Sequence, residues 1–426
     1  MRRPIKVLRC GRLIDGSGST AKRDQAILIE GSTIRQVGPD SEVRAPKGAE
    51  VIDASDKTVM PGLFDCHLHF FGMTTDNWIT SQLEPRELSL IRSVDDARRL
   101  LEAGYTTVRD CAGMNGVFLK KAINEGSIKG PRILAAGLML TQTFGAGDVD
   151  YLPSEWVDYR QVPRDFSTYS VICDGVPECT KAARFVLRQG ADFIKIASTG
   201  GVLSKGNKPE YEQFTHDEIR AIVREAANAG KFVAAHSMGT GGIKNSILSG
   251  VRTIDHAWYP DDECLSLAKE RGTVFVPTLS WDLQIINKGE EAGYSSWAVE
   301  KERAAWKERM KRLQKARRAG VTLASGTDFS GSPLTRMGEN AMELEALVEH
   351  CGYSPMEAIV AATANGAKAC GLEGATGKIE PGKLADLLVV DGDPSREIAV
   401  LRDVEKIKLV MKEGVTEVER RAARAS

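Results

Sequence analysis

The sequence predicts a mixed α/β protein: a (β/α)8 TIM barrel combined with a small β-sandwich domain that is formed from both chain termini. Three observations lead to this prediction. Short apolar runs alternate with helical patterns through the middle of the 426-residue chain, whereas both ends alternate apolar and polar residues as antiparallel strands do. The chain also exceeds the roughly 250 residues of an ordinary barrel by enough for a second, smaller domain.

The two ends of the chain carry the strand-like segments. Residues 1–61 contain IKVLRCGRLID, QAILIEGSTIRQVG and AEVIDASDKTVMPG, each ending at Gly, Asp or Pro. Residues 371–426 contain GKIEPGKLADLLVVDGDP and KIKLVMKEG, followed by a charged tail, 416–426, that is expected to form a surface helix or to fray. We therefore assign the N-terminal part of the β-sandwich to 1–61, and its C-terminal part with the tail to 371–426.

Residues 62–370 are predicted to form the barrel. A doubly wound sheet is the main alternative, but no G-x-G-x-x-G follows the first strand. Helical patterns such as 216–230 and 297–320 lie between several of the strands. The expected strands start with GLFDCHLHF and continue at 106–110, 132–140, 192–199, 231–237, 252–258, 273–279 and 321–329. Two aperiodic segments rich in Gly, Pro and aromatic residues, 144–175 and 201–214, are predicted to be loops over the site.

Composition narrows the classes of partner. The formal net charge is −1, and the basic residues are dispersed, which argues against nucleic acid or an anionic membrane as the main partner. The eight cysteines form no C-x-x-C pair, and no stretch has the length of a signal h-region or of a membrane span. We therefore expect a cytoplasmic protein with reduced thiols, which acts on a small molecule and forms a homo-oligomer.

Four of the six histidines lie at the ends of predicted strands, where active sites of barrels gather. His67 and His69 are two residues apart, so that both can face the barrel interior and offer imidazoles to one metal ion. His236 and His256 end two successive strands. One such histidine is more often a hydrogen-bonded core residue, but two at matching heights favour metal ligands.

Lys195 lies in the apolar strand DFIKIAST and is predicted to face the interior with Phe193 and Ala197, while Ile194 and Ile196 pack outward on helices. An unpaired buried ammonium group is costly. One interpretation is an ion pair with a nearby carboxylate. The other is a neutral amine that is carboxylated by CO2, because the resulting carbamate has two oxygens that can bridge two cations.

Asp328 follows the eighth predicted strand, where a carboxylate can bind a metal ion and accept a proton from water. The alternative is a turn or a helix cap, which is common for Asp after Gly-Thr. Asp65 and Asp255 each lie close to a histidine, Asp65 two residues before His67 and Asp255 next to His256, but their places along the strands put a ligand role in doubt. We expect them at most to support the ligands from behind.

These motifs resemble the metal-dependent amidohydrolase superfamily, in the branch with a carboxylated lysine on the fourth strand. The resemblance runs along nearly the whole chain, and the closest subgroup is the imidazolonepropionase-related, prolidase-like set. That set includes Xaa-Pro and Xaa-Arg dipeptidases, carboxypeptidases and ochratoxin-hydrolysing amidohydrolases. The resemblance rests on the motifs PGLFDCHLH, AGYTTVRD, FIKIASTGGVLS, VAAHSMG, TIDHA and AATANGAKACGLEGATGKIEPGKLADLLVVD.

The resemblance implies two divalent metal ions, with zinc as the natural choice for imidazole-rich ligands. His67, His69 and Asp328 would hold one ion, and His236 and His256 the other. Lys195, carboxylated by CO2, would bridge them, and Asp328 would also be the catalytic proton carrier. The implied reaction is hydrolysis of the amide bond of an N-acyl amino acid or dipeptide, which releases the C-terminal amino acid.

The chain departs from the family pattern near the expected substrate. Residues 143–148 are TFGAGD where family members often have TGGHGD, and Met238 stands where many have an aromatic residue or His. Both changes favour a pocket for a bulky aromatic acyl group. Candidate substrate-binding residues, which are otherwise ordinary loop residues, are Ser204, Lys205, Tyr211, Met238, Tyr259 and Arg336. A basic one among them could hold a substrate carboxylate.

Two other functions remain open at this stage. A mononuclear cyclic-amide hydrolase or deaminase of the same fold would lack the bridging lysine, and deaminases place a Glu shortly after the fifth-strand His. The chain has Lys195 and no Glu in HSMGTGG. A non-catalytic barrel scaffold is the third possibility, but loss of function is expected to leave gaps in the ligand set, and the sequence shows none.

Overall fold

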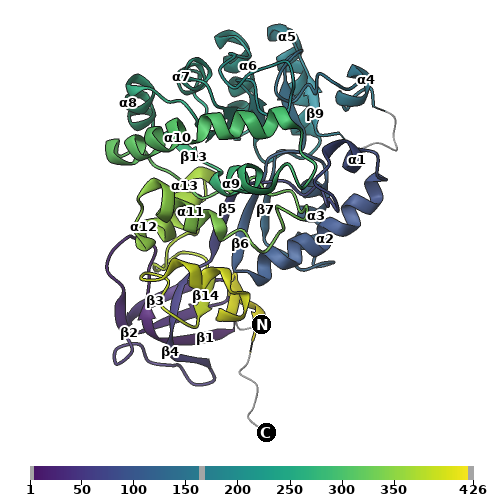
Figure 1. The fold of residues 1–426 in the computed structure, drawn as a ribbon. Coiled ribbons are helices and arrows are strands. Elements are labelled where there is room, and N and C mark those ends of the chain that lie inside the picture. Colours follow the sequence, from purple (N-terminus) through teal and green to yellow (C-terminus); the bar gives the residue numbers. More distant parts are fainter. Residues whose placement is uncertain (1–3, 163–167, 421–426) are drawn as a thin grey trace.

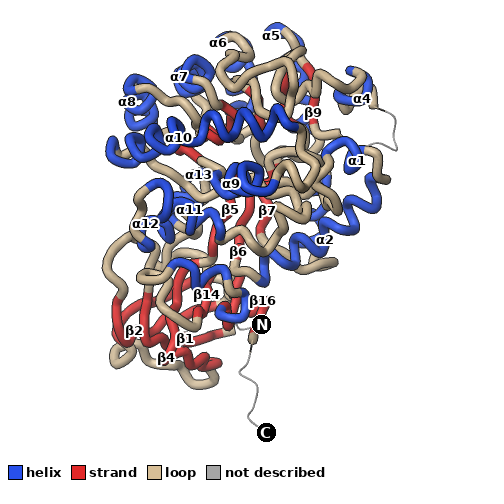
Figure 2. The backbone as a smooth tube through the Cα atoms, in the orientation of Figure 1, coloured by secondary structure: helices blue, strands red, loops and turns tan. Residues whose placement is uncertain are grey.

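The computed structural model describes residues 4–162 and 168–420. Figure 1 shows strands from both ends of the chain gathered at the bottom, and the long middle part, with helices on its outside, above them. Figure 2 shows mainly strands in the part formed by the two chain ends, and strands together with helices in the middle part, as predicted.

Strands from both ends of the chain share one seven-stranded sheet with the order β16-β15-β14-β4-β1-β2-β3. Its centre joins the two ends, because β4 pairs in parallel with β1 and antiparallel with β14, with Met60 opposite Leu388. The strands are β1 (Ile5–Leu13), β2 (Lys22–Glu30), β3 (Thr33–Pro39), β4 (Glu50–Pro61), β14 (Leu387–Val390), β15 (Ile407–Lys412) and β16 (Val415–Glu419). The helix or frayed tail expected from residue 416 is therefore wrong up to Glu419, which lies in β16; residues 421–426 lie outside the described part.

The middle of the chain supplies parallel strands in two sheets. One has the order β5-β6-β7, and the other the order β13-β12-β11-β10-β8-β9. The three-stranded sheet comprises β5 (Leu63–Leu68), β6 (Tyr105–Asp110) and β7 (Arg132–Ala135). The six-stranded sheet comprises β8 (Met139–Thr141), β9 (Ser170–Ile172), β10 (Ile194–Ala197), β11 (Val233–Ser237), β12 (Thr253–His256) and β13 (Val274–Val276).

Three sequence-based boundaries differ from the structure. The single strand expected at 132–140 is divided into β7 and β8 around Gly137, whose φ of 67° interrupts the extended backbone. Residues 321–329 form no continuous strand but make isolated parallel bridges, Leu323 with Phe275 and Phe329 with Leu68, so that this segment lies between β13 and β5. The expected loop 144–175 contains α4 and β9, and its residues 163–167 lie outside the described part.

Helices follow most of the parallel strands and cover their outward side. Ile194 and Ile196 of β10 pack in the same apolar cluster as Ile219 and Ile222 of α6, whereas Phe193 packs on the opposite side in a small interior cluster. The helices are α1 (Trp78–Gln82), α2 (Arg86–Glu102), α3 (Asn115–Asn124), α4 (Ser154–Val157), α5 (Gly175–Arg188), α6 (His216–Asn228), α7 (Thr240–Ser249), α8 (Asp262–Arg271), α9 (Leu279–Lys288), α10 (Ser296–Ala319), α11 (Met342–Cys351), α12 (Pro355–Ala361) and α13 (Ala364–Cys370), with 3-10 turns η1 (Ile398–Arg402) and η2 (Val404–Lys406).

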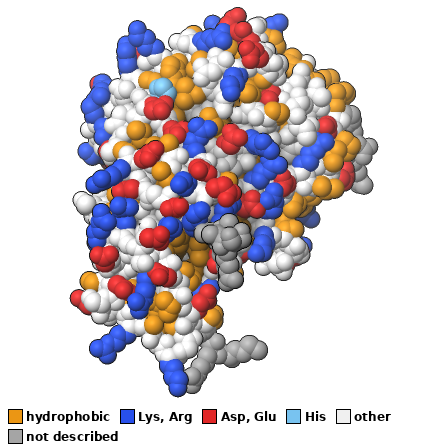
Figure 3. Space-filling view, turned by 60° about the horizontal axis from the view of Figure 1, so that its bottom comes forward, with side chains coloured by type: hydrophobic (Ala, Val, Ile, Leu, Met, Phe, Trp, Pro, Cys, Tyr) orange, Lys and Arg blue, Asp and Glu red, His pale blue; other side chains and the backbone are white. Residues whose placement is uncertain are grey.

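The surface carries both signs of charge. Lys and Arg side chains lie interspersed with Asp and Glu over the face that Figure 3 shows, in keeping with the net charge of −1. Among the described helices, none combines the length and the apolar character that crossing a bilayer requires.

Candidate metal centre

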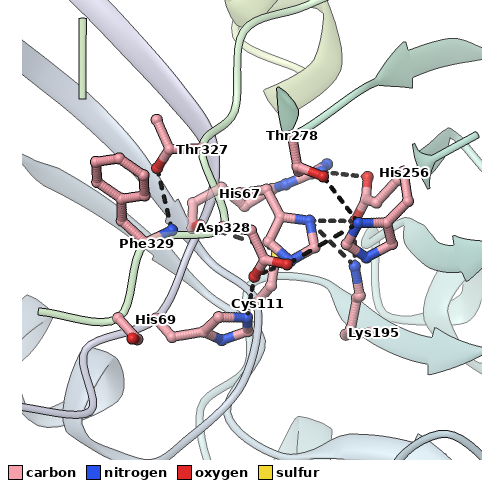
Figure 4. A network of polar contacts seen from close by, with 12 residues as sticks. His67, His69, Cys111, Lys195, His256, Thr278, Thr327, Asp328 and Phe329 are labelled. Carbon is pink, nitrogen blue, oxygen red and sulfur yellow. Dashed lines mark hydrogen bonds and ion pairs between the residues drawn. The ribbon is translucent and has the colours of Figure 1, made fainter. Parts of the chain in front are cut away.

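The four histidines of the predicted strand ends converge on Asp328. His69 Nε2 lies 3.0 Å and His67 Nε2 3.3 Å from Asp328 Oδ1, and His256 Nδ1 lies 3.9 Å from its Oδ2. His236 lies beside this group, with the centroid of its ring 4.5 Å from that of the His256 ring. Figure 4 shows the rings of His67, His69 and His256 around the Asp328 carboxylate. These side chains come from β5, β11, β12 and the segment after residue 321, far apart in the sequence.

The donor atoms of this group are suited to a divalent cation. Ligand atoms of His67, His256 and Asp328 all lie within 4.8 Å of one another. Among the residues that the structure describes, the buried Nδ1 of His69 finds no hydrogen-bond partner, which is an unusual cost for a buried polar atom. Imidazole nitrogen and carboxylate oxygen are the donors that zinc-type sites use. The residues therefore fit the metal that the sequence predicts.

Backbone conformations at the strand ends turn side chains into this group. His256 has a φ of 73° and Asp328 a φ of 61°, both in the left-handed region that costs a non-glycine residue energy. Thr278, which contacts Nδ1 of His256 at 2.9 Å through its hydroxyl, has a φ of 56°. Strain of this kind persists only where the surrounding structure enforces it, and here it is concentrated at the candidate site.

A glycine gives His67 its place. A Cβ atom at Gly326 would lie 2.8 Å from the backbone N of His67 and 3.0 Å from its Cβ. Asp65 ties the same two segments together, because its carboxylate accepts hydrogen bonds from the backbone N–H of His67 and from the N–H and hydroxyl of Thr327. Asp65 thus fixes the segment that carries Asp328 against β5.

Lys195 points into the group from β10 and is 2% exposed. Its Nζ lies 3.5 Å from Nδ1 of His67 and forms an ion pair with Asp255. The unmodified amine therefore has the carboxylate partner that the simpler interpretation of the sequence expects. Asp255 also lies 3.2 Å from Nδ1 of His67, so it contacts two of the predicted ligands from the side away from Asp328.

Arg109 of β6 is a site residue that the sequence analysis missed. It is fully buried, and its guanidinium donates to Asp255 Oδ1 at 2.8 Å, to the hydroxyl of Thr253 at 3.0 Å and to the carbonyl oxygen of Cys66. It thereby joins β5, β6 and β12 directly beneath the histidines. Arg109 is a charged residue inside a predicted barrel strand, where a buried charge needs a partner. That placement is the signal that could have revealed it.

The electrostatics favour neutral imidazoles at His236 and His256 beside an ionised carboxylate, whereas burial lowers the pKa of His67 but Cys111, Asp328 and Asp255 outweigh it and raise that pKa well above its ordinary value. Burial, helped by the charge of Lys195, lowers the pKa of His236 to about 4, and burial together with His236 lowers the pKa of His256 well below its usual value. Burial raises the pKa of Asp328, but the charges and hydrogen bonds of His67 and His69 outweigh it and leave that pKa well below the ordinary range. Neutral histidine and ionised aspartate are the forms that bind metal.

A cavity of about 130 Å³ opens onto these residues. Apart from the histidines, Lys195 and two acids, its walls are largely apolar or aromatic. They comprise Phe71, Met73, Ala112, Met139, Ala146, Tyr169, Gly201, Val202, Leu203, Met238, Trp281, Asp282, Tyr294, Asp328 and Ser330, with the site residues His67, His69, Lys195, His236 and His256. Trp281, Tyr294 and Tyr169 escaped the sequence analysis because nothing in their local pattern separates them from core aromatics.

Of the six candidate substrate-binding residues, Met238 lines this cavity. The others lie around it or farther out. Ser204 is buried, Lys205 lies with its Nζ 5.6 Å from the centroid of the Trp297 ring, and Tyr211 is 46% exposed. Tyr259 packs edge-on against Trp258. Arg336 is close enough to Asp96 to lower the pKa of that carboxyl, although burial raises it to about 7.

The chain is similar to known hydrolases along nearly its full length. The sequence profile of the Amidohydrolase family matches residues 58–416. An ochratoxinase of Aspergillus niger is 35% identical over 96% of this chain and 86% of that protein, and an imidazolonepropionase of Geobacillus kaustophilus is 28% identical over 97% of both. The crystal structure of A. niger ochratoxinase has a TM-score of 0.88 at 33% identity, and covers 98% of this chain and 96% of its own. A Xaa-Pro dipeptidase with bound methionine has a TM-score of 0.85 at 32% identity, with 97% and 99% covered.

Proposed function

Because the chain belongs to the amidohydrolase family, we propose that it is a binuclear metal-dependent hydrolase that cleaves the amide bond of an N-acyl amino acid or dipeptide and releases the C-terminal amino acid. The observation that carries this proposal is the convergence of four imidazoles, Asp328 and Lys195 on one buried point. Such a set is otherwise difficult to account for, because buried polar groups are costly without partners.

The proposed architecture is a closed (β/α)8 barrel over residues 62–370, with a β domain built from 1–61 and 371–426. Two features support closure of the barrel. Residues 321–329 bridge to both β13 and β5, and β7 and β8 belong to one run of chain, although they pair in different sheets. The sheet that strands from both termini share supports the assignment of a second domain.

In the proposed centre, His67, His69 and Asp328 hold one ion and His236 and His256 the other. Two divalent ions, zinc by preference for imidazole donors, supply charge that polarises the substrate carbonyl and makes water a nucleophile near neutral pH. The contacts of the Asp328 carboxylate with three histidines and the unpaired Nδ1 of His69 support this assignment.

Lys195 is proposed to bridge the ions after carboxylation. The Lys195 ammonium group first loses one proton, and the neutral amine nitrogen then forms a bond to the carbon of CO2 and releases a second, so that a cation becomes a carbamate anion. This change removes the attraction to Asp255. Arg109 supports the proposal, since it keeps a positive partner on Asp255 at 2.8 Å when Lys195 has become negative.

Asp328 is proposed to move the proton. Its pKa, lowered by His67 and His69, keeps the carboxylate ionised and ready to accept a proton from the attacking water. The same carboxylate then delivers that proton to the leaving amine nitrogen as the C–N bond breaks. The acyl group leaves as a carboxylate, and its acid proton passes to the amine, so that the second half leaves as an ammonium group and both protons of the water are accounted for.

For the substrate, we propose a bulky aromatic acyl group. The apolar and aromatic walls of the cavity, with Met238 where many family members have an aromatic residue or His, support it. So does the similarity to an ochratoxinase, which exceeds that to imidazolonepropionases. N-aroyl amino acids should therefore be turned over better than simple Xaa-Pro dipeptides.

We further propose a cytoplasmic homo-oligomer. The eight cysteines are all free and buried, which fits a reducing compartment. Two apolar side chains in and directly after α1, Ile79 and Leu83, are exposed, and a second copy would cover them. Sedimentation equilibrium of the purified protein tests the assembly, and a monomer at micromolar concentration would refute it.

One set of measurements tests the function. The protein, purified without chelator, is assayed against N-acyl amino acids and dipeptides, with released amino acids identified by mass spectrometry, and its metal content is measured by plasma emission. We expect two ions per chain, and we expect chelation to abolish turnover and added Zn²⁺ to restore it. With ¹³C-bicarbonate, the protein should give a carbamate ¹³C signal that the Lys195→Arg variant lacks. One ion per chain with ammonia release would favour a deaminase instead, and neither metal nor turnover would favour a scaffold.

A further inference from the structure

A second, larger cavity adjoins the candidate metal centre. Its volume is about 260 Å³, and it shares the side chains of Phe71, Met73 and Tyr169 with the cavity that contains the histidines. Most of the remaining wall comes from α2, α3 and the segments around them. These further lining residues are Phe70, Ser81, Arg86, Glu87, Ser89, Leu90, Gly113, Met114, Asn115, Phe118, Tyr159 and Thr168.

The polar side chains in this wall are already occupied. The hydroxyl of Ser89 donates to the carbonyl oxygen of Phe71, and that of Thr168 to the carbonyl oxygen of Val157. The amide of Asn115 donates to the carbonyl oxygen of Phe70 at 2.8 Å. Because these donors are spent on the backbone, the cavity offers few groups to a polar guest and favours an apolar one.

The two charged lining residues have opposite signs. Arg86 and Glu87 are neighbours in the first turn of α2, and Glu87 is exposed. They bring no net charge to the cavity, whose other side chains are aromatic rings, methionines, Leu90 and the polar groups that already donate to the backbone. A carboxylate would therefore gain little there, whereas an aromatic ring would be surrounded by apolar surface.

Phe71 forms the partition between the two cavities. Its ring stacks on that of His69 with centroids 4.8 Å apart, and lies 5.7 Å from the ring of Tyr169. On the other side is Gly113, where a Cβ atom would lie 3.0 Å from the Phe71 ring and the φ of 100° favours glycine. Because Phe71, Met73 and Tyr169 line both cavities, a substrate that spans them has to pass beside the Phe71 ring.

We propose that this second cavity binds the aromatic acyl group of the substrate while the scissile amide lies at the metal centre. The proposal rests on the proposed function, since it takes the substrate to be an N-acyl amino acid. In such a substrate the amino acid half carries the carboxylate, which the apolar cavity would not favour, so the acyl half is the one that fits. A dry cavity of about 150 Å³ is enough to hold benzene, so that the space here accommodates a two-ring group.

The test compares substrates that carry the same naphthyl group on either side of the amide. N-(2-naphthoyl)-alanine places it on the acyl half, N-acetyl-3-(2-naphthyl)alanine on the amine half, and N-acetylalanine carries none. Leu90→Trp fills the cavity from α2, and Ile91→Trp is the matched control, because Ile91 is 66% exposed and does not line the cavity.

We expect the ratio of kcat/KM for the naphthoyl substrate to that for N-acetylalanine to fall at least tenfold in Leu90→Trp and to stay within twofold in Ile91→Trp. A ratio unchanged in the folded Leu90→Trp protein overturns the proposal. A fall that affects only the naphthylalanine substrate overturns the assignment to the acyl half. If Leu90→Trp fails to fold, Phe118→Ala takes its place, because the Phe118 side chain is 42% exposed. The kcat/KM ratio should then fall at least threefold, since the ring contact is lost. An unchanged ratio would count against the proposal.

Calorimetric titration with 2-naphthoate separates the two hypotheses. Binding to the unaltered protein that weakens at least tenfold in Leu90→Trp supports the cavity assignment even if no amide is hydrolysed, in which case the proposed function alone fails. Hydrolysis without any binding of 2-naphthoate leaves the function intact and overturns the cavity assignment.

Discussion

Replacing Arg109 by Met tests whether the charges beneath the metal centre depend on one another. The substitution keeps a long apolar stem and removes the guanidinium, which is fully buried and donates to Asp255, Thr253 and the Cys66 carbonyl oxygen. Asp255 is itself 0% exposed. Its pKa, which burial raises, is held well below the usual value by Arg109 and Lys195. Without Arg109, the Asp255 charge is left with Lys195 as its remaining cation.

The expected loss follows from this geometry. Removing one partner of a buried ion pair costs about 3–5 kcal/mol, because the other charge stays buried without compensation. Lys195 compensates part of the charge while its amine is unmodified, so we expect about 3 kcal/mol for the uncarboxylated protein. Carboxylation of Lys195 removes that help, so the loss should move toward about 5 kcal/mol.

The assay is urea unfolding followed by circular dichroism and tryptophan fluorescence, on metal-free protein and on protein reconstituted with Zn²⁺ and bicarbonate. Arg109→Met, Asp255→Asn and the double variant form a cycle, in which removal of both charges should cost at least about 1 kcal/mol less than the sum of the two single changes. A loss below about 1 kcal/mol for Arg109→Met, or a coupling within about 0.5 kcal/mol of zero, would refute the reasoning.

Three further predictions concern other parts of the site. Gly326→Ala should lower the bound metal per chain, measured by plasma emission, while circular dichroism stays native, because the new methyl group would lie 2.8 Å from the backbone N of His67; full metal content would contradict this. Burial raises the pKa of Glu343 to about 8 from an ordinary value of 4.5. The folded state therefore holds a proton between these values that the unfolded state has lost, so stability should fall as pH rises from about 5 to 8, and the fall should be smaller in Glu343→Gln; equal slopes would speak against it. Lys301→Met removes an ammonium group that donates to three carbonyl oxygens of residues 201–207 and so positions this segment. In steady-state kinetics KM should rise several-fold while kcat is nearly unchanged. A drop confined to kcat would disagree with a positioning role.

Where the strand pattern is regular, the sequence predicted side-chain directions well. The period of two placed Lys195 opposite Ile194 and Ile196, and the structure packs the two isoleucines with helix α6 while Lys195 lies inside. The helical pattern at 216–230 likewise predicted a helix that the structure confirms as α6, and the structure adds a capping box of Thr215 and Glu218 at its start.

The pattern failed where the backbone leaves the strand conformation. Adjacent residues of a strand point to opposite faces, so that Asp255 and His256 could not both be expected at the site. Asp255 faces inward as a regular strand residue, and His256 also turns inward because its φ is 73°. A single sequence gives no signal for such a conformation in a histidine, and this is why the sequence offered Asp255 only as a supporting residue and did not identify it as the carboxylate beside Lys195.

Tertiary contacts also decided what the loops do. Lys205 is basic and near the site in sequence, but its Nζ lies over the Trp297 ring, and its backbone N–H donates to Asp150. Trp281 and Tyr294, by contrast, line the cavity from segments whose local pattern predicted only apolar packing. Loop composition indicates exposure, but the packing of one loop on another determines which side chains meet a ligand.

The pairing of β4 with β14 has a consequence for biosynthesis. As the chain leaves the ribosome, β4 emerges early, while the strand that completes its antiparallel edge is translated only after the whole middle of the chain. Until then this edge, from Thr58 to Pro61, has unpaired backbone groups that can recruit a strand from another nascent chain. A truncation before Leu387 should therefore give aggregates rather than a smaller folded enzyme.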